Sequence, residues 1–218
     1  GEVLGFAGLV GSGRTETMRL IFGADKKESG KIYINGKEVD IRNPRDAIAN
    51  EMGFVTENRK EEGLFLRQSV RRNTAMVAVK KILKFGCCFD FAKEKKYAEH
   101  YIKALNVATP SSQQTVMFLS GGNQQKVVLA KWLMSEPRIV IFDEPTRGID
   151  VGAKREIYEI INRLTAEGKV VLVVSSDMEE VMGISDRILV MHEGEISGEV
   201  AKKDFSQKLI TQYAVGGN

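Results

Sequence analysis

Gly8-Leu9-Val10-Gly11-Ser12-Gly13-Arg14-Thr15 is a glycine-rich stretch that follows a strand-like apolar run and opens a helix-like segment. Glycines let backbone N–H groups converge on an anion, and the N-terminus of a helix adds positive potential there. The hydroxyl of Thr15 has the position from which such loops ligate Mg²⁺. The spacing predicts a phosphate-binding loop with Arg14 where lysine is usual, although the octapeptide taken alone fits an ordinary glycine-rich turn equally well.

The segments on either side of this loop alternate short apolar runs with helical spacing, which is typical of βα units around a largely parallel sheet. Asn35-Gly36 between two short runs predicts a type I′ hairpin. Asn43 followed by Pro44 predicts the start of a short helix. We expect strands over 3–10, 31–34, 37–40, 138–142, 170–174 and 187–191, and longer helices over 14–22, 123–134, 151–167 and 205–213.

Between about residues 58 and 118 the pattern changes to helical spacing. Ala98, Tyr101, Ile102 and Leu105 recur at i, i+3, i+4 and i+7, which is one apolar face of a helix. We therefore expect three parts: residues 1–58 as the first part of a nucleotide-binding core, 59–118 as a helical subdomain, and 119–218 as the second part of the core.

The composition excludes several classes of protein. The 218 residues are 43% hydrophobic and 28% charged, with a net charge of +3, which excludes disordered, collagen-like and membrane-spanning chains. Basic and acidic residues are interspersed, so no stripe indicates nucleic-acid binding. Cys87 and Cys88 are the only cysteines and are adjacent, which favours a reducing compartment. The chain opens on Gly1 inside a strand-like run, and we expect it to be a fragment of a longer protein.

Two carboxylates follow an apolar run at Arg138-Ile139-Val140-Ile141-Phe142-Asp143-Glu144. Parallel α/β sheets place ligand chemistry at the carboxyl ends of their strands. We expect Asp143 to hold Mg²⁺ through water and Glu144 to orient or deprotonate an attacking water. Two acids at the end of a strand form a solvated turn more often, but the phosphate-binding loop upstream weakens that alternative.

A second glycine pair precedes an apolar helix at Leu119-Ser120-Gly121-Gly122-Asn123-Gln124-Gln125-Lys126. This octapeptide resembles the signature motif of ATP-binding cassette proteins. In that family the signature of one cassette closes over the γ-phosphate of ATP that lies on the phosphate-binding loop of another cassette. The stretch 143–150 is similar to the family's Walker B motif and D-loop, so three motifs occur in the family's order.

The resemblance narrows to one branch of the family. Residues 56–60 with Gly63-Leu64, 119–126 and 146–154 resemble the C-terminal cassette of the tandem ATP-binding subunit of bacterial monosaccharide importers. This implies an α/β fold: a RecA-like P-loop NTPase core, a helical subdomain and a partial antiparallel β edge. It also implies ATP and Mg²⁺, an N-terminal cassette in the same chain, membrane permease subunits and, indirectly, a sugar-binding protein. The implied location is peripheral, on the cytoplasmic face of the bacterial plasma membrane.

The resemblance also assigns site residues. Glu144 would be catalytic. Metal binding would fall to Thr15, Glu57 and Asp143. Nucleotide contacts would come from two sets, the first around the phosphate-binding loop (Gly8, Gly11, Ser12, Gly13, Arg14, Thr15, Glu16 and Ser176) and the second in the signature (Ser120, Gly121, Gly122 and Asn123).

Three positions depart from the family pattern. Arg14 replaces the usual lysine, Glu57 stands where glutamine is usual, and Ser176 stands where a histidine is usual. The rigid guanidinium fork cannot curl into the loop as an ammonium does. The charge of Glu57 would cost about 3 kcal/mol at ~5 Å from a phosphate charge with an effective dielectric constant near 20. We therefore expect the chain's own site to hydrolyse ATP poorly and its signature to serve the partner cassette.

Two further expectations concern partners. An exposed apolar patch at Gly63, Leu64 and Phe65 would suit docking of a permease helix, with packing inside the helical subdomain as the alternative. The other functions to weigh are a soluble cassette ATPase that acts on ribosomes or DNA and a purely regulatory cassette. The lack of sustained heptads between residues 58 and 118 argues against the former, and the retention of Asp143 and Glu144 argues against the latter.

Overall fold

The computed structural model describes residues 1–217. The chain divides into two compact units. The first unit contains residues 1–54, 138–144 and those from 161 onward, and the second unit contains 55–137 and 145–160.

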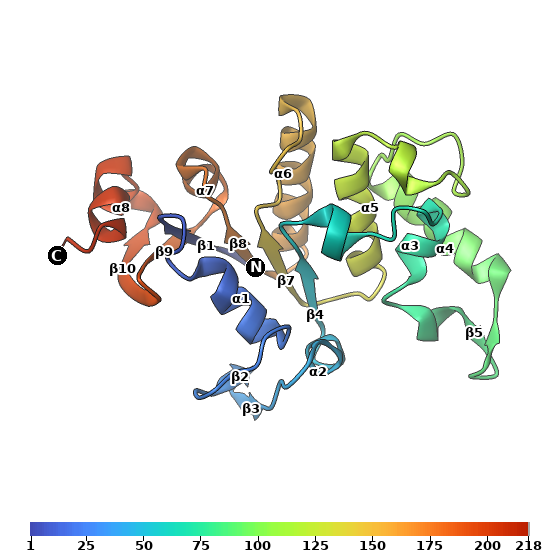
Figure 1. Ribbon diagram of the computed structural model, residues 1–218, viewed down its shortest axis with the longest axis horizontal. Helices are drawn as coiled ribbons and strands as arrows, with labels where there is room; N and C mark the ends of the chain where they lie inside the picture. Colours follow the sequence, from blue (N-terminus) through green and yellow to red (C-terminus); the bar gives the residue numbers. More distant parts are fainter. Residues whose placement is uncertain (218) are drawn as a thin grey trace. The chain divides into compact units, whose positions relative to one another are not determined.

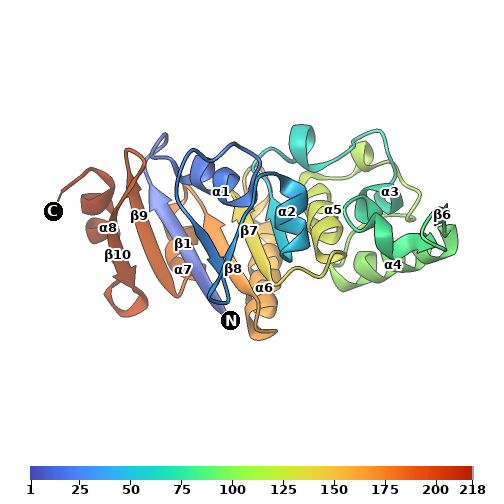
Figure 2. The same ribbon diagram turned by 90° about the horizontal axis from the view of Figure 1, so that it is seen from below.

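The first unit is built on a six-stranded sheet with the order β10-β9-β1-β8-β7-β4, and Figure 2 shows β10, β9, β1, β8 and β7 side by side. The strands are β1 (Glu2–Gly8), β4 (Met52–Val55), β7 (Ile139–Asp143), β8 (Val170–Val174), β9 (Arg187–His192) and β10 (Glu195–Ala201). β1 pairs in parallel with β8 and β9, β7 pairs in parallel with β8, and β10 is antiparallel to β9. The carboxyl ends of β1, β7 and β8 therefore lie at one edge of the sheet.

Burial explains the continuous apolar runs of the central strands. Val140, Ile141 and Phe142 of β7 are fully buried, as are Val171 and Val173 of β8. Strands that are covered on both faces read as apolar runs rather than as alternating patterns. The helices of this unit are α1 (Arg14–Phe22), α2 (Pro44–Ala49), α7 (Met178–Ile184), α8 (Gln207–Ala214) and the short turn η4 (Lys202–Asp204), while α6 (Val151–Ala166) runs from the second unit into the first.

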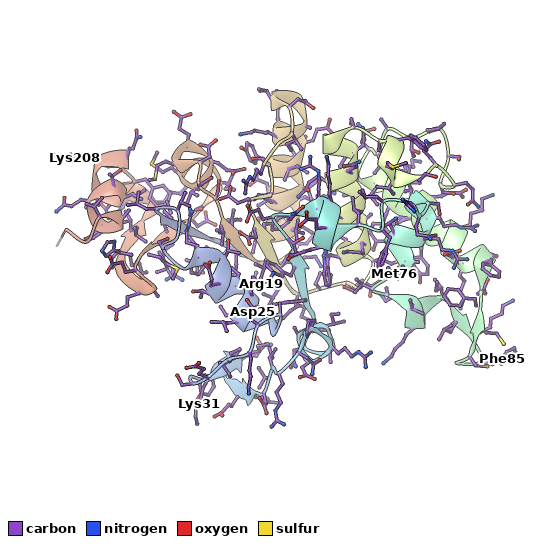
Figure 3. The ribbon with its side chains drawn as sticks, in the orientation of Figure 1. Arg19, Asp25, Lys31, Met76, Phe85 and Lys208 are labelled. Atoms are coloured by element: carbon purple, nitrogen blue, oxygen red, sulfur yellow. The ribbon has the colours of Figure 1, made fainter. Side chains whose placement is uncertain are left out.

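Helix α1 spans the residues that the sequence predicts, and both of its ends have a clear cause. It begins after Gly13, and Gly23 ends it in the left-handed region at φ 71°. Arg19 donates from Nε and Nη2 to the two carboxylate oxygens of Asp25, at 2.8 and 3.1 Å, and Figure 3 shows these side chains next to one another. Arg19 holds the pKa of Asp25 below its usual value.

The predicted hairpin is also confirmed. β2 (Ile32–Ile34) and β3 (Lys37–Val39) pair around Asn35 and Gly36, whose φ values of 51° and 74° fit a type I′ turn. Within residues 1–217 these two strands form a separate two-stranded sheet, which agrees with the expected partial antiparallel edge. The Asn43 side chain accepts from the N–H groups of Arg45 and Asp46 at the start of α2.

The second unit is mainly helical. In Figure 1, α3 (Val70–Ala75), α4 (Phe91–Ala104) and α5 (Gly121–Leu133) pack together. The short elements are η1 (Arg59–Gly63), η2 (Val79–Ile82), η3 (Val116–Phe118) and the strands β5 (Leu83–Lys84) and β6 (Cys88–Phe89). Ala98, on the predicted apolar face of α4, is fully buried.

Several boundaries differ from the prediction by one or two residues, and some elements were not predicted. β1 ends at Gly8 rather than at 10 because the chain turns there at φ 152°. α5 begins at Gly121 rather than at 123, since Ser120 and not Asn123 caps it. α7, which the apolar periodicity did not reveal, is capped by Asp177. β10 was also missed, because only Val200 in it is buried. In the described part of the chain, residues 1–217, no helix combines the length and the apolar character that a membrane span needs.

Candidate functional site

The glycine-rich loop of the first unit connects β1 to α1 and needs its glycines for conformation. Gly8, Gly11 and Gly13 have φ values of 152°, 82° and 93°. A Cβ on Gly8 would lie 2.4 Å from the carbonyl oxygen of Met191 and 2.5 Å from the Ser12 hydroxyl. Any side chain at position 8 would collide with these atoms unless the loop shifted.

The start of α1 offers hydrogen-bond donors to an anion. Gly13 is the N-cap residue and supplies no side-chain cap, so the first N–H groups of the helix need other partners. The Ser12 hydroxyl is buried and has no hydrogen-bond partner within residues 1–217, whereas Glu16 in the first helical turn is exposed. An open loop with a free helix start and an unpaired buried hydroxyl fits a phosphate group.

Arg14 directs its guanidinium to the neighbouring strand. The side chain is buried, and Nη1 donates to the Ser175 carbonyl oxygen, just past the end of β8, at 2.6 Å. The positive charge of Arg14 opposes in small part the burial that raises the pKa values of Asp143 and Glu144. This arginine is therefore anchored at the end of β8.

Thr15 and Asp143 form the pair that suits a divalent cation. Thr15 Oγ1 donates to Asp143 Oδ1 at 3.0 Å. Burial, assisted by the charges of Glu144 and Glu16, raises the pKa of Asp143 to about 6, against the lowering effect of the Thr15 hydrogen bond and the Arg14 charge. A carboxylate whose ionisation is costly gains much from a cation at its oxygens. Hydroxyl and carboxylate oxygens are the ligands that Mg²⁺ prefers.

Glu144 follows directly after β7 and has the strained backbone angle φ 47°. Burial raises the pKa of Glu144 above its ordinary value, which suits a general base near neutral pH. Ser176 Oγ donates to Glu144 Oε2 at 3.1 Å. The first unit thus places Ser176 against the carboxylate of Glu144, a contact that the sequence pattern did not indicate.

The signature lies in the second unit, at the start of α5. The Ser120 side chain accepts from the Asn123 backbone N–H at 3.5 Å and from Asn123 Nδ2 at 2.9 Å. Asn123 Oδ1 accepts from the Ala108 backbone N–H at 2.7 Å. Asn123 therefore fixes the cap by bonding to Ser120 on one side and to the preceding loop on the other.

The two signature glycines leave space for neighbouring groups, and the space is tightest at Gly122. A Cβ on Gly122 would lie 2.6 Å from Ala153 Cβ. A Cβ on Gly121 would lie 2.8 Å from Arg59 Nη2 and 3.2 Å from the Gly148 carbonyl oxygen. Neither glycine has a positive φ, so close approach of neighbouring groups, not an unusual backbone conformation, requires them.

Glu57 lies in the second unit and forms an ion pair with Arg147. Arg147 therefore offsets part of the negative charge that the sequence suggests is harmful.

Arg59 lies in the same unit, and its Nη1 and Nη2 donate to the carbonyl oxygens of Arg147 and Gly148 at 2.8 and 3.1 Å. A cavity of about 350 Å³ is lined by Glu57, Asn58, Arg59, Lys60, Arg147 and Gly148. Sequence reasoning missed both arginines, because nothing local indicates that residues 57–59 meet 147–148.

The apolar residues exposed near position 65 differ from those that the sequence predicts. Gly63 and Leu64 are buried and Phe65 is 57% exposed. Met117 N donates to the Leu66 carbonyl oxygen at 3.0 Å, which brings Met117 beside this segment. Met117 and Phe118 are also exposed, Phe118 to 71%. The apolar surface in this part of the second unit therefore consists of Phe65, Met117 and Phe118, named here the apolar patch.

Comparison with known proteins agrees with this geometry. Residues 1–147 match the ABC transporter family profile. The chain is 53% identical over 215 residues to the ribose import ATP-binding protein RbsA of Clostridium tetani, with 99% of this chain and 43% of that protein aligned. It is 51% identical over 216 residues to a putative ribose/galactose/methyl galactoside import ATP-binding protein of Halalkalibacterium halodurans, with 99% and 41% aligned. The chain thus spans less than half the length of these curated relatives.

Solved structures match the fold. One is the dimeric ATP-binding cassette MJ0796 in a post-hydrolysis state with ADP and Pi, at 23% identity and a TM-score of 0.78, with 94% of this chain and 87% of that chain covered. Another is a nucleotide-free ATP-binding cassette from an ABC transporter, at 19% identity and a TM-score of 0.79, with 99% and 88% covered. The predicted P-loop NTPase fold with cassette-type helical parts is confirmed.

Proposed function

Because this chain belongs to the ABC transporter family, we propose that it is the second of two ATP-binding cassettes in one polypeptide and that it helps to power monosaccharide import. The names of its relatives support the import of ribose or a related sugar. The relative from Clostridium tetani aligns along 99% of this chain but only 43% of its own length, which leaves room for another cassette in a full-length chain.

In this proposal the first unit binds the phosphates of ATP. The N–H groups of the loop and of the first turn of α1, with the Ser12 hydroxyl, contact phosphate oxygens. Thr15 and Asp143 hold Mg²⁺, which when bound neutralises charge on the phosphates. Glu144 orients the attacking water and accepts its proton, and its raised pKa favours that role.

Three features are expected to slow ATP hydrolysis at the phosphate-binding loop of the first unit. The Arg14 guanidinium is engaged by the Ser175 carbonyl oxygen and is too rigid to follow a moving phosphate. Ser176 is bonded to Glu144, and this hydrogen bond favours the ionised carboxylate but supplies no positive charge to the phosphate. Glu57 places a negative charge where glutamine is usual in the family, and its ion pair with Arg147 offsets only part of that charge. Residual hydrolysis here is therefore expected to be low.

The signature serves the partner cassette in this proposal. Ser120, Gly121, Gly122 and Asn123 form the start of α5, a helix of 13 residues. Its first N–H groups and the Ser120 hydroxyl would stabilise charge on the phosphoryl group held by the N-terminal cassette. Preorganised donors of this kind act strongly because they need no rearrangement during the reaction.

The apolar patch of Phe65, Met117 and Phe118 receives a permease subunit. Exposed apolar side chains from two adjacent segments form the kind of surface that a partner can cover. The chain would then be peripheral to the cytoplasmic face of the plasma membrane and would meet the sugar-binding protein only through the permease.

The observation that carries the proposal is the presence of a phosphate-binding loop, an acid pair and a signature helix in one chain. The test is ATP-dependent uptake of labelled ribose, galactose and xylose by vesicles that contain the full-length protein and its permease, supplied with the binding protein. We expect uptake of at least one sugar with ATP and none with a non-hydrolysable analogue. An Lys208→Ala variant, altered at an exposed lysine of α8, is the matched control. Absence of ATP-dependent uptake of all three sugars would contradict the proposal.

A further inference from the structure

We propose that Arg59 is a positioning residue that joins the signature helix and the segment after Glu144 into one rigid element. Its guanidinium donates from Nη1 to the Arg147 carbonyl oxygen at 2.8 Å and from Nη2 to the Gly148 carbonyl oxygen at 3.1 Å. On its other side, Nη2 lies 2.8 Å from where a Cβ of Gly121 would stand. Three segments that are distant in sequence therefore meet at one side chain.

The surroundings of Arg59 are shaped for a guanidinium. Gly121, the first residue of α5, leaves the space that Nη2 occupies. Gly148 has φ 66°, and a Cβ there would lie 3.8 and 3.9 Å from Nη2 and Nη1. Glycine at 121 leaves space for the guanidinium, and glycine at 148 permits the positive φ of the segment whose carbonyl oxygens accept from it. A lysine ammonium on a flexible stem does not reproduce this fork.

The guanidinium of Arg59 is partly buried. Nε of Arg59 is buried without a partner in the described chain, residues 1–217, and desolvation lowers the pKa of the guanidinium. The two charge-assisted hydrogen bonds to the carbonyl oxygens hold the guanidinium and residues 147–148 against one another. The ion pair between Glu57 and Arg147 ties the same two segments a second time.

The consequence rests on the proposed function, in which the signature acts on nucleotide of the partner cassette. Arg59 also begins η1, whose last residue, Gly63, comes just before Phe65 of the apolar patch. A displacement of η1 would then be transmitted by Arg59 to the start of α5 and to residues 147–148 together. Misplacement of reacting groups by about 1 Å costs roughly 100-fold in rate.

The experiment is steady-state phosphate release by the full-length protein assembled with its permease. We expect Arg59→Lys to lower kcat by about 10- to 100-fold, with KM for ATP within about twofold, because the positioning acts on the reaction and not on nucleotide affinity. Arg155→Lys is the control, since Arg155 lies on α6 with 84% of its side chain exposed.

A second variant separates positioning from folding. In Arg59→Ala we expect millimolar methylguanidinium, but not methylammonium, to restore part of kcat by entering the neighbouring cavity of about 350 Å³. A wild-type kcat in Arg59→Lys would overturn the proposal, as would equal rescue by both cations or a loss of kcat that only follows a lower melting temperature. An inactive wild-type transporter would instead contradict the proposed function.

Discussion

The chain contains two glycine-rich helix starts, and they use glycine for different reasons. In the loop before α1, Gly8, Gly11 and Gly13 adopt positive φ values that side chains disfavour. At the start of α5, Gly121 and Gly122 have ordinary helical backbone and leave room for Arg59 and Ala153. Two similar glycine-rich motifs thus depend on backbone conformation in one place and on packing in the other.

The electrostatics of the two regions differ as well. Near α1, the carboxylates of Asp143 and Glu144 are desolvated, and their pKa values are raised. Near α5, Glu57 is paired with Arg147, and Arg59 is bonded to carbonyl oxygens. The first region therefore gains from a cation, whereas the second already holds its own positive charges.

The largest expected loss of stability distinguishes Gly8, needed for its backbone conformation, from Gly122, needed for packing. Gly8→Ala should lower the free energy of unfolding by more than about 3 kcal/mol, because the methyl group would meet the Met191 carbonyl oxygen, which cannot yield. Gly122→Ala should cost about 1–3 kcal/mol through its clash with Ala153. Urea unfolding measures both.

Only the stability lost in Gly122→Ala can be recovered by a second substitution. Adding Ala153→Gly to Gly122→Ala removes the opposing methyl group and should recover most of the lost stability. If the double variant is as unstable as the two single changes added together, Gly122 is not a packing glycine and the contrast fails.

A smaller effect is expected from Asp143→Asn in the absence of Mg²⁺. The pKa of Asp143 is about 6 in the folded chain against 3.8 as its ordinary value, so between these values the folded state binds more protons and its stability falls as pH rises. Asparagine does not titrate. The variant should match the wild type near pH 4 and exceed it by at most about 3 kcal/mol above pH 6.

Thermal unfolding across this pH range is the measurement. Asp25→Asn is the control, because Arg19 lowers the pKa of Asp25 and its replacement should give no gain at neutral pH. A gain for Asp143→Asn that is equally large at pH 4 would show that titration of Asp143 is not the cause.

The smallest effect concerns the cap of α5. Ser120→Ala removes the oxygen that accepts from Asn123 and should cost about 1 kcal/mol of stability. Ser120→Asn keeps an acceptor and should cost much less. Guanidinium titrations of the two variants test this, and equal stability of both would mean that the cap contributes nothing.

The sequence predicted those parts of the fold whose causes are local. The hairpin at Asn35-Gly36, the cap at Asn43 and the bounds of α1 all depend on neighbouring residues, and all are confirmed. The α7 helix was missed because its seven residues are too few for a clear period, although Asp177 before Glu179 and Glu180 was a usable cap signal.

The contacts within the candidate site were harder to predict than the elements of the fold. The loop residues and the acid pair could be named from spacing, but their contacts could not. Ser176 bonds to Glu144 across 32 positions of the sequence, and Arg59 bonds to Arg147 across 88. Such contacts are set by the sheet order and by helix packing, which no local pattern contains.

In the proposed function this chain's signature contributes more to turnover than its own acid, Glu144. The most direct test is steady-state phosphate release by the full-length transporter with Ser120→Asp, Ser120→Asn or Glu144→Gln. Aspartate and asparagine both cap helices well, so the first two variants differ mainly in a negative charge at the signature. We predict a loss of about 100- to 1000-fold for Ser120→Asp, a much smaller loss for Ser120→Asn, whose side-chain amide replaces the hydroxyl as a donor, and most of the activity retained in Glu144→Gln. A greater loss in Glu144→Gln than in Ser120→Asp would contradict the account.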